Sequence, residues 1–372
     1  MRIGVPTEIK PQELRVGLTP ASVQEFVSHG HSVVVQSGAG AGIRAGDEVY
    51  IAAGAEIVGD AASVFDAAEM IIKVKEPQPS ERAMLRDGQI LYTYLHLAPD
   101  PDQATELCEA GVFAIAYETV TDGAGGLPLL APMSEVAGRL AVQAAAQSLT
   151  ATSEGRGILL GGVPGVLPAQ VVVIGGGVVG LNAARMATGL GADVTVLDRS
   201  IARLREVDEM FDGRIRTLYS TRNALEEAVA GADAVIGAVL VAGARAPKLV
   251  TREMLGTMKT GAAIVDVAID QGGCFETSHP TTHEDPTFVV DGVVHYCVAN
   301  MPGAVPLTAS TALNHATLAP GLKIADLGLA QALQEDPHLM NGLNVAKGAI
   351  VHPVVTKALN RVFVPPEEIL SA

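Results

Sequence analysis

Several side chains that could pair with ions and move protons stand after apolar runs of the sequence. Lys75 and His96 each follow such a run, and Arg15 lies in a polar segment shortly after the first run. Asp270 follows another run much later in the chain. An Arg fork or a Lys ammonium binds a carboxylate, and an imidazole transfers protons near neutral pH. A carboxylate stabilises a developing cation, so this set suits oxidation of an amino acid through an iminium.

Taken singly, each of these four side chains is also compatible with a structural role. A lone Arg or Lys is commonly a solvated charge, and a His after a strand is commonly bonded by its neighbours. The histidines show no HExxH or other metal spacing, so we predict no metal. Hydrolysis is not indicated, because Ser153, Ser200 and Ser310 lack the context of a nucleophile elbow.

A glycine-rich turn predicts a dinucleotide site. Gly175, Gly177 and Gly180 have G-x-G-x-x-G spacing, after an apolar run and before an amphipathic one. The first glycine permits a tight turn, the second lets the backbone approach a pyrophosphate, and the third lets the helix pack on the strand. The free N–H groups at the start of the helix then bind phosphate.

Asp198 indicates which dinucleotide cofactor we expect. It ends the next apolar run, at 198 − 180 = 18 positions beyond the last glycine, near the spacing of about 20 for a ribose-binding acid. A carboxylate accepts from the 2′-hydroxyl and repels a 2′-phosphate, which predicts NAD rather than NADP. The neighbouring Arg199 is either a solvated surface residue or a ligand for that phosphate.

The ends of the later apolar runs are further candidates, because ligands of open α/β sheets bind beyond the carboxyl ends of the strands. Val239 and Leu240 either form an apolar shelf for a ring or pack in the core. The residues at these ends are Ser220, Val239, Leu240, Asp270, Asn300 and Met301.

The elements that must position these residues alternate between strand-like and helix-like patterns. The expected strands are Ile3–Val5, Ser32–Gln36, Met70–Val74, Gln89–Thr93 and Val112–Ala116, then Val171–Gly175, Val194–Asp198, Ile215–Tyr219, Ala234–Ala238, Ile264–Val267 and Val294–Val298. The expected helices between them are Pro20–His29, Asp102–Ala110, 178–190, 200–210 and 223–230. We predict an α/β protein of two domains, with a Rossmann doubly wound parallel sheet inserted into a discontinuous α/β catalytic domain.

Two longer helices are expected on either side of the second run. One covers Ser134–Thr152 with Ser134 as its N-cap, and the other runs from Thr308 to about Leu333 with a break at Pro320-Gly321. A chain that enters a unit by one helix and leaves by another can return to its first domain. We therefore expect a substrate domain of residues 1–130 plus 307–372 and an NAD-binding domain of 131–306. A ligand between them would lie in an interdomain cleft.

Composition limits the classes of partner. The 372 residues carry a net charge of −16, which disfavours nucleic acid and anionic membranes. The cysteines Cys108, Cys274 and Cys297 form no CxxC pair, which favours reduced thiols in the cytosol. The sequence shows neither a signal peptide nor an unbroken apolar run of about 18 residues. We therefore expect a cytoplasmic enzyme acting on small molecules.

Seven segments resemble bacterial alanine dehydrogenases, and together they span essentially the whole chain. They are Pro6-Thr7-Glu8-Ile9-Lys10 with Arg15, Lys73-Val74-Lys75-Glu76-Pro77, Tyr94-Leu95-His96-Leu97, the run from Leu130 to Arg139, the run from Gly161 to Val166, the run from Val265 to Glu276, and Val298-Ala299-Asn300-Met301-Pro302. The chain is thereby identified as a member of the alanine dehydrogenase and pyridine nucleotide transhydrogenase family.

The resemblance implies NAD-dependent deamination of L-alanine to pyruvate and ammonium, and the reverse reaction, by a homohexamer. It implies that Arg15 and Lys75 bind the substrate and that His96 and Asp270 are the catalytic pair. It also implies an NAD site lined by Ser134, Gly177, Val178, Val179, Asp198, Arg203, Ser220, Val239, Leu240, Val267, Ala268, Ile269, Asp270, Val298, Ala299, Asn300 and Met301.

Two positions depart from the family pattern. Relatives often carry Lys at 203 and Arg at 279, where this chain has Arg203 and His279, which bears on NAD affinity and its pH dependence. Two alternatives remain: the soluble NAD(H)-binding part of a proton-translocating transhydrogenase, and a non-catalytic NAD-binding module. The combination of Arg15, Lys75, His96 and Asp270 favours the dehydrogenase.

Overall fold

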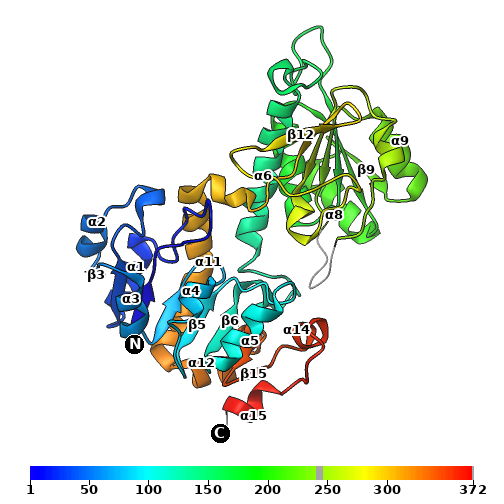
Figure 1. Cartoon of the computed structure of the whole chain (residues 1–372). Coiled ribbons are helices and arrows are strands. Elements are labelled where there is room, and N and C mark those ends of the chain that lie inside the picture. Colours follow the sequence, from blue (N-terminus) through cyan, green and yellow to red (C-terminus); the bar gives the residue numbers. More distant parts are fainter. Residues whose placement is uncertain (240–245, 371–372) are drawn as a thin grey trace. The chain divides into compact units, whose positions relative to one another are not determined.

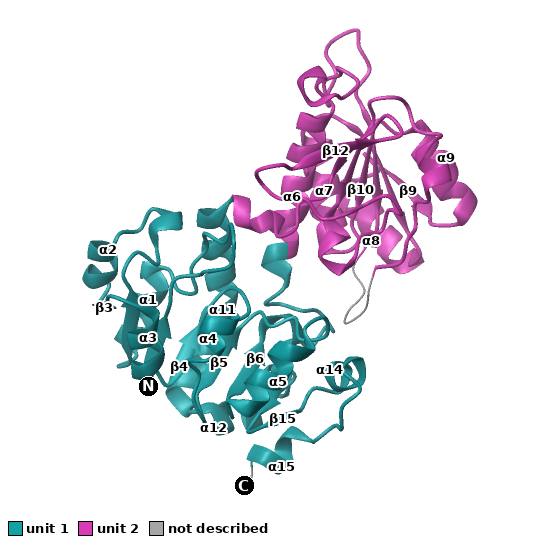
Figure 2. Ribbon diagram, in the orientation of Figure 1, with its two compact units in different colours: residues 1–133, 305–372 teal, residues 134–304 magenta. Residues whose placement is uncertain are grey.

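The computed structural model describes residues 1–239 and 246–370 and divides into two compact units (Figure 2). The first unit comprises Met1–Met133 with Val305–Ala372, and the second comprises Ser134–Ala304. Each unit is built on a parallel-dominated sheet with helices on its faces (Figure 1). The predicted α/β class is confirmed.

The second unit holds a seven-stranded sheet in the order β12-β13-β11-β10-β7-β8-β9. Counted from β7, its parallel strands have the order 3-2-1-4-5-6, which is that of the Rossmann fold, and β12 is added antiparallel at one edge. The strand order reverses between β7 and β10, so ligands are expected at their carboxyl ends. The strands are β7 (Gln170–Ile174), β8 (Asp193–Asp198), β9 (Arg216–Tyr219), β10 (Ala234–Gly237), β11 (Ala263–Asp266), β12 (Thr287–Val290) and β13 (Val293–Tyr296).

The first unit repeats this strand order in a sheet of eight strands, β15-β14-β6-β5-β4-β1-β2-β3. Strands β1 to β6 are parallel, and β14 and β15 extend the sheet antiparallel to β6. The order reverses between β1 and β4. The strands are β1 (Arg2–Val5), β2 (Ser32–Gln36), β3 (Glu56–Val58), β4 (Met70–Ile72), β5 (Ile90–Thr93), β6 (Phe113–Ala116), β14 (Leu343–Ala346) and β15 (Ala349–Ile350).

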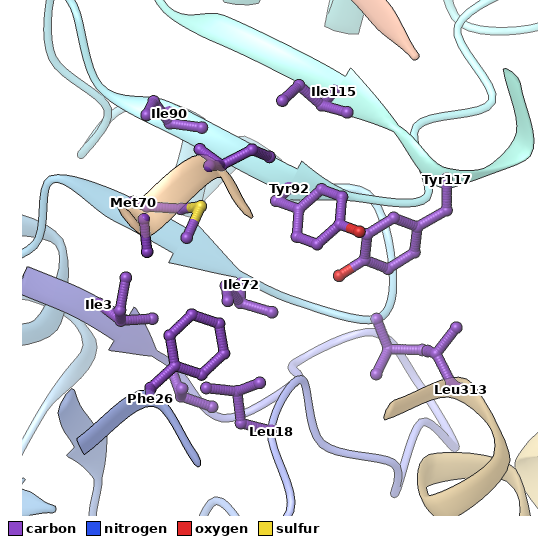
Figure 3. Close-up of a cluster of buried hydrophobic side chains, with 14 of the residues drawn as sticks. Ile3, Leu18, Phe26, Met70, Ile72, Ile90, Tyr92, Ile115, Tyr117 and Leu313 are labelled. Carbon is purple, nitrogen blue, oxygen red and sulfur yellow. The ribbon is translucent and has the colours of Figure 1, made fainter. Parts of the chain in front are cut away.

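Both faces of the first sheet are buried, which explains why its strands are continuously apolar. Along β2, Val33 and Val35 belong to one hydrophobic cluster and Val34 to another. This alternation follows from the two-residue period of a strand. Figure 3 shows the first cluster, in which Tyr92 and Tyr117 meet edge to face with ring centroids 4.5 Å apart.

Helices cover the sheets in both units. Among the described residues, no helix is long and apolar enough to cross a membrane. The helices are α1 (Pro20–Ser28), α2 (Asp47–Ala52), α3 (Ala61–Ala67), α4 (Pro79–Arg82), α5 (Pro101–Glu109), α6 (Ala131–Ser148), α7 (Val178–Gly189), α8 (Ile201–Phe211), α9 (Arg222–Gly231), α10 (Arg252–Leu255), α11 (Pro306–Leu327), α12 (Leu329–Glu335), α13 (Pro337–Met340), α14 (Pro353–Ala358) and α15 (Pro366–Leu370), with short 3-10 turns η1 (Ala41–Ile43), η2 (Tyr117–Thr119), η3 (Ala151–Ser153), η4 (Val267–Gln271) and η5 (Met301–Ala304).

The break expected at Pro320-Gly321 is wrong, because α11 continues through Pro320 and ends at Leu327. Packing stabilises the helix there. The Tyr92 hydroxyl donates to the Thr317 carbonyl at 3.1 Å, and Gly321 lies so close to the rings of Phe26 and Tyr92 that an added Cβ would be 3.2–3.3 Å from them. The break comes instead at Gly328, whose φ of +77° suits glycine.

The N-cap expected at Ser134 is also wrong, because α6 begins at Ala131. The preceding turn already bonds to it, since the Ala131 N–H donates to the Leu127 carbonyl at 2.9 Å. Pro132 then occupies the first turn of the helix, where a missing N–H costs nothing. Ser134 therefore lies inside the helix.

Candidate functional site

The glycine turn of the second unit has the geometry of a phosphate cradle. Gly175 has a φ of +101°, which only glycine adopts without strain. A Cβ on Gly180 would lie 1.8 Å from the Gly175 carbonyl oxygen, so α7 packs directly on the turn. A Cβ on Gly177, the N-cap of α7, would meet nothing within 4 Å. The turn is thus closed where the helix meets the strand and open where a pyrophosphate would approach.

Asp198 joins the end of β8 to this turn. Its Oδ2 accepts from the Gly176 N–H at 2.7 Å, and its Oδ1 accepts from the Ser200 N–H at 2.8 Å. Arg203 also holds the turn, because its Nε–H donates to the Gly176 carbonyl at 2.5 Å. Arg199 is exposed. The carboxylate predicted to bind ribose thus also fixes the backbone of the phosphate turn.

A buried carboxylate holds the loop that carries Asp270. Asp266, at the end of β11, accepts from the N–H groups of Ala268 at 3.2 Å and Cys274 at 2.9 Å. Burial raises the pKa of Asp266, although its hydrogen-bond donors oppose this shift. Asp270 is exposed on η4, and its Oδ1 accepts from the Asn300 N–H at 3.3 Å. Two segments predicted to line the NAD site therefore meet at Asp270.

The other predicted NAD-site residues differ in how far they are exposed to solvent. Val298 and Met301 are buried in the core of the second unit, at 0% and 3% exposure. Val239 is partly buried and packs against the hydrophobic core. This packing agrees with the second of its two interpretations, a residue of the core. Leu240 lies outside the described residues. Val178 is exposed, and the partly exposed ones are Ser134, Ser220, Val267, Ala299 and Asn300, whereas Val179, Ala268 and Ile269 are buried.

Arg15 in the first unit is buried and held in a fixed orientation. Its Nε donates to Glu13 Oε1 at 2.7 Å and its Nη2 to Oε2 at 2.5 Å, and its Nη1 is 3.0 Å from the Met133 sulfur. Burial disfavours the guanidinium, but its hydrogen bonds and attraction to Glu13 outweigh this and raise the pKa of Arg15. Arg15 is therefore a permanent, oriented cation.

Lys75 and His96 follow neighbouring parallel strands, β4 and β5, as predicted from their positions after apolar runs. Lys75 is half-buried, and its carbonyl accepts from the Thr93 hydroxyl at 3.0 Å. His96 is exposed and has the left-handed φ of +49°. Because parallel strands run in one direction, both residues lie at the carboxyl ends of the strands of the first sheet.

The orientation of His96 depends on two residues that sequence reasoning missed. Glu118 accepts from the His96 N–H at 2.6 Å and lies 3.9 Å from its Nδ1. The Tyr94 ring stacks on the imidazole, with centroids 5.8 Å apart and planes at 6°. Glu118 follows β6 as His96 follows β5, so the same strand-end rule applied to Val112–Ala116 would have found it. The pairing of Glu13 with Arg15 carried no comparable signal.

Comparison with known proteins places this geometry in a family. The model of the alanine dehydrogenase/PNT N-terminal domain matches residues 4–137, and that of the alanine dehydrogenase/PNT C-terminal domain matches residues 141–353. The chain belongs to the alanine dehydrogenase/PNT family. The predicted family membership is confirmed.

Relatives match this family member along nearly their whole length. The alanine dehydrogenase of Halomonas elongata is 58% identical over 364 residues, which is 98% of each chain. A solved L-alanine dehydrogenase superposes with a TM-score of 0.93 at 51% identity, covering 97% of this chain and 99% of the other. A transhydrogenase structure from Sinorhizobium meliloti gives 0.81 at 27% identity, covering 95% and 99%. Within residues 1–239 and 246–370, no group of three potential ligands is placed to hold a metal.

Proposed function

We propose that this protein is an NAD-dependent alanine dehydrogenase, which interconverts L-alanine with pyruvate and ammonium. The observation that carries the proposal is the position of Lys75 and His96, which follow the adjacent parallel strands β4 and β5 at their carboxyl ends. Buried Arg15 supplies a fixed cation in the same unit. We propose residues 1–133 and 305–372 as the substrate domain and 134–304 as the NAD-binding domain.

The proposed chemistry assigns one task to each side chain. Arg15 and Lys75 bind the substrate carboxylate and carbonyl side. Bound NAD would supply the acceptor for the hydride that leaves Cα once the alanine ammonium has given a proton to solvent. His96 then removes a proton from the water that attacks the iminium and delivers it to the nitrogen of the carbinolamine, which collapses to pyruvate and ammonium. We propose Asp270 as the carboxylate that stabilises the cationic iminium.

The residues of the second unit fit NAD. The open side of Gly177 admits a pyrophosphate, the N-terminus of α7 supplies N–H donors, and Asp198 supplies an acceptor for a ribose hydroxyl. The remaining candidate ligands are those predicted from the sequence, with Asp270 and Asn300 adjoining one another.

The deciding experiment is NADH absorbance with purified protein, NAD and L-alanine, with NADP and other amino acids as controls. A signal with NAD and alanine alone supports the proposal. Silence in both directions, including pyruvate with ammonium and NADH, contradicts it. If NAD binding persists in the silent protein, the transhydrogenase-like role becomes the better reading, consistent with the similarity to the Sinorhizobium meliloti structure.

Replacing Asp198 with alanine should lower affinity for NAD by about tenfold, the worth of one hydrogen bond to a charged group. It should also raise the ratio of kcat/KM for NADP over that for NAD, because the charge that repels a 2′-phosphate is gone. Steady-state kinetics with both cofactors measure this ratio. A merely disturbed turn would lower both values and leave the ratio unchanged. Arg199→Ala tests the alternative, in which loss of Arg199 weakens NADP alone.

We further propose that the protein is a cytoplasmic homo-oligomer, a hexamer by its family resemblance. The segment between η3 and β7 supports self-association, because it exposes Leu159 at 67%, Val163 at 53%, Val166 at 63% and Leu167 at 89%. Clustered exposed apolar side chains mark association surfaces. Leu167→Glu should therefore reduce the mass measured by light scattering. Ile51→Glu, at an exposed position of α2, is the control. An unchanged mass for Leu167→Glu would exclude the segment between η3 and β7 from the interface.

A further inference from the structure

The two sequence motifs nearest the switch point of the first sheet are joined by buried charges. Glu8 follows β1, and Lys73 and Lys75 follow β4. The side chain of Lys73 has 0% exposure, and those of Glu8 and Glu81 have 2% each. Lys73 Nζ donates to Glu8 Oε2 at 3.0 Å and to Glu81 Oε1 at 2.7 Å. A fully buried ion network of this kind is costly unless every group is satisfied.

Glu8 differs from Glu81 in what its second oxygen binds. Glu8 Oε1 accepts from the Val74 N–H at 2.6 Å and the Lys75 N–H at 3.4 Å. Glu81 Oε2 accepts instead from the Gln78 N–H at 2.7 Å. The two carboxylates therefore share Lys73, but only Glu8 holds the backbone from which the Lys75 side chain departs.

We propose that Glu8 is a positioning residue that fixes the direction of Lys75 toward the substrate. This assignment rests on the proposed function. The Lys75 peptide is held on both sides, because the Thr93 hydroxyl donates to its carbonyl at 3.0 Å. Lys73 in turn holds Glu8 in place. Burial favours neutral Lys73, but the charges of Glu8 and Glu81 outweigh it and raise the pKa of Lys73. Burial also raises the pKa of Glu8, against the attraction of Lys73.

The charge of Glu8 also acts on Arg15, the second cation proposed to bind the substrate. The charge of Glu8 raises the pKa of Arg15, after the larger effects of burial, Glu13 and Tyr94. Glu8 thus acts on both residues proposed to bind the substrate carboxylate, through the backbone of one and the field at the other. A neutral amide supplies no charge, and its single acceptor oxygen cannot serve both the Val74 and Lys75 N–H groups and Lys73 Nζ.

Glu8→Gln is the sharpest test, and Glu81→Gln is its matched control. An amide has one acceptor oxygen, while each glutamate faces two donors, so each substitution must forfeit one contact. Both variants should lose thermal stability. Only Glu8→Gln should raise KM for pyruvate and its Kd for the protein–NADH complex by about tenfold, the worth of one hydrogen bond to a charged group. The Kd of NADH alone should stay within about twofold of wild type in both.

Calorimetric titration with pyruvate, in NADH and without ammonium, measures the Kd, and steady-state kinetics separate KM from kcat. Equal increases in KM for both variants, or a destabilised Glu8→Gln with wild-type KM, would overturn the assignment. If Glu8→Gln does not fold, Thr93→Val removes the other hold on the Lys75 peptide without burying an unpaired charge. It should raise the same KM, and a wild-type value would overturn the assignment. A wild-type protein that neither binds nor reduces pyruvate would instead overturn the proposed function, and the assignment with it.

Discussion

Replacement of His96 by alanine is expected to lower kcat by about two to four decades, the usual effect of losing a general acid or base. The imidazole is exposed, stacked on Tyr94 and fixed at its backbone by Glu118. Without it, no side chain at this position can take a proton from the attacking water. The measurement is steady-state kinetics in both directions at saturating alanine and at saturating pyruvate.

A second variant separates the loss of the imidazole from backbone strain. His96 has a φ of +49°, and alanine in that left-handed region costs about 1 kcal/mol or more. Asparagine adopts the region more readily, so His96→Asn should lose as much activity with less loss of stability. His315→Ala, an exposed histidine of α11, is the control. Wild-type turnover in His96→Asn would remove His96 from the mechanism.

Alanine at two glycines of the same turn should weaken NADH binding for two different reasons. In Gly180→Ala the methyl group would meet the Gly175 carbonyl at 1.8 Å, so the variant should lose about 3 kcal/mol of stability or more, as in severe overpacking. In Gly177→Ala the methyl group meets nothing within 4 Å, so stability should change by less than about 0.5 kcal/mol. It does, however, fill the space needed by the pyrophosphate.

Thermal unfolding and NADH fluorescence titration distinguish the two cases. Gly180→Ala should show a lowered Tm and weak binding, whereas Gly177→Ala should show an unchanged Tm and binding weakened by about tenfold or more. A wild-type Tm for Gly180→Ala would mean that α7 does not need close contact with the turn. Wild-type NADH affinity for Gly177→Ala would place the cofactor elsewhere.

Most of the apolar strands of both sheets could be predicted because they are buried on two faces, although β9 was predicted and is mostly exposed. Ser32–Gln36 coincides with β2, and most of the others differ from the observed strands by one or two residues. The missed strands β3 and β14 are short and are not continuously apolar. β3 has only three residues, none fully buried, and β14 is a four-residue segment whose Asn344 is buried through bonds to Thr119 and Gly342. Pro320 was misread because ring packing around Gly321 cannot be seen in local sequence.

The candidate site was predictable to the extent that strand ends determine it. The positions of Lys75 and His96 at the same end of the sheet could be predicted, because the carboxyl ends of parallel strands lie together. Their partners were not predicted, because Glu8, Glu13 and Glu118 act through particular atoms on Lys75, Arg15 and His96. A short motif can show that a carboxylate is present, but the hydrogen bonds that it makes across the sheet depend on the tertiary fold.

The pairing of β14 with β6 also determines the order in which the chain can fold on the ribosome. Strand β6 ends at Ala116, but its antiparallel partner begins only at Leu343, after the whole second unit has been synthesised. The second unit is continuous and can fold as it emerges, whereas the first must wait for the C-terminal segment. During that interval β6 is an unprotected edge, able to pair with another nascent chain. Slow synthesis of the last seventy or so residues would therefore prolong the aggregation-prone stage.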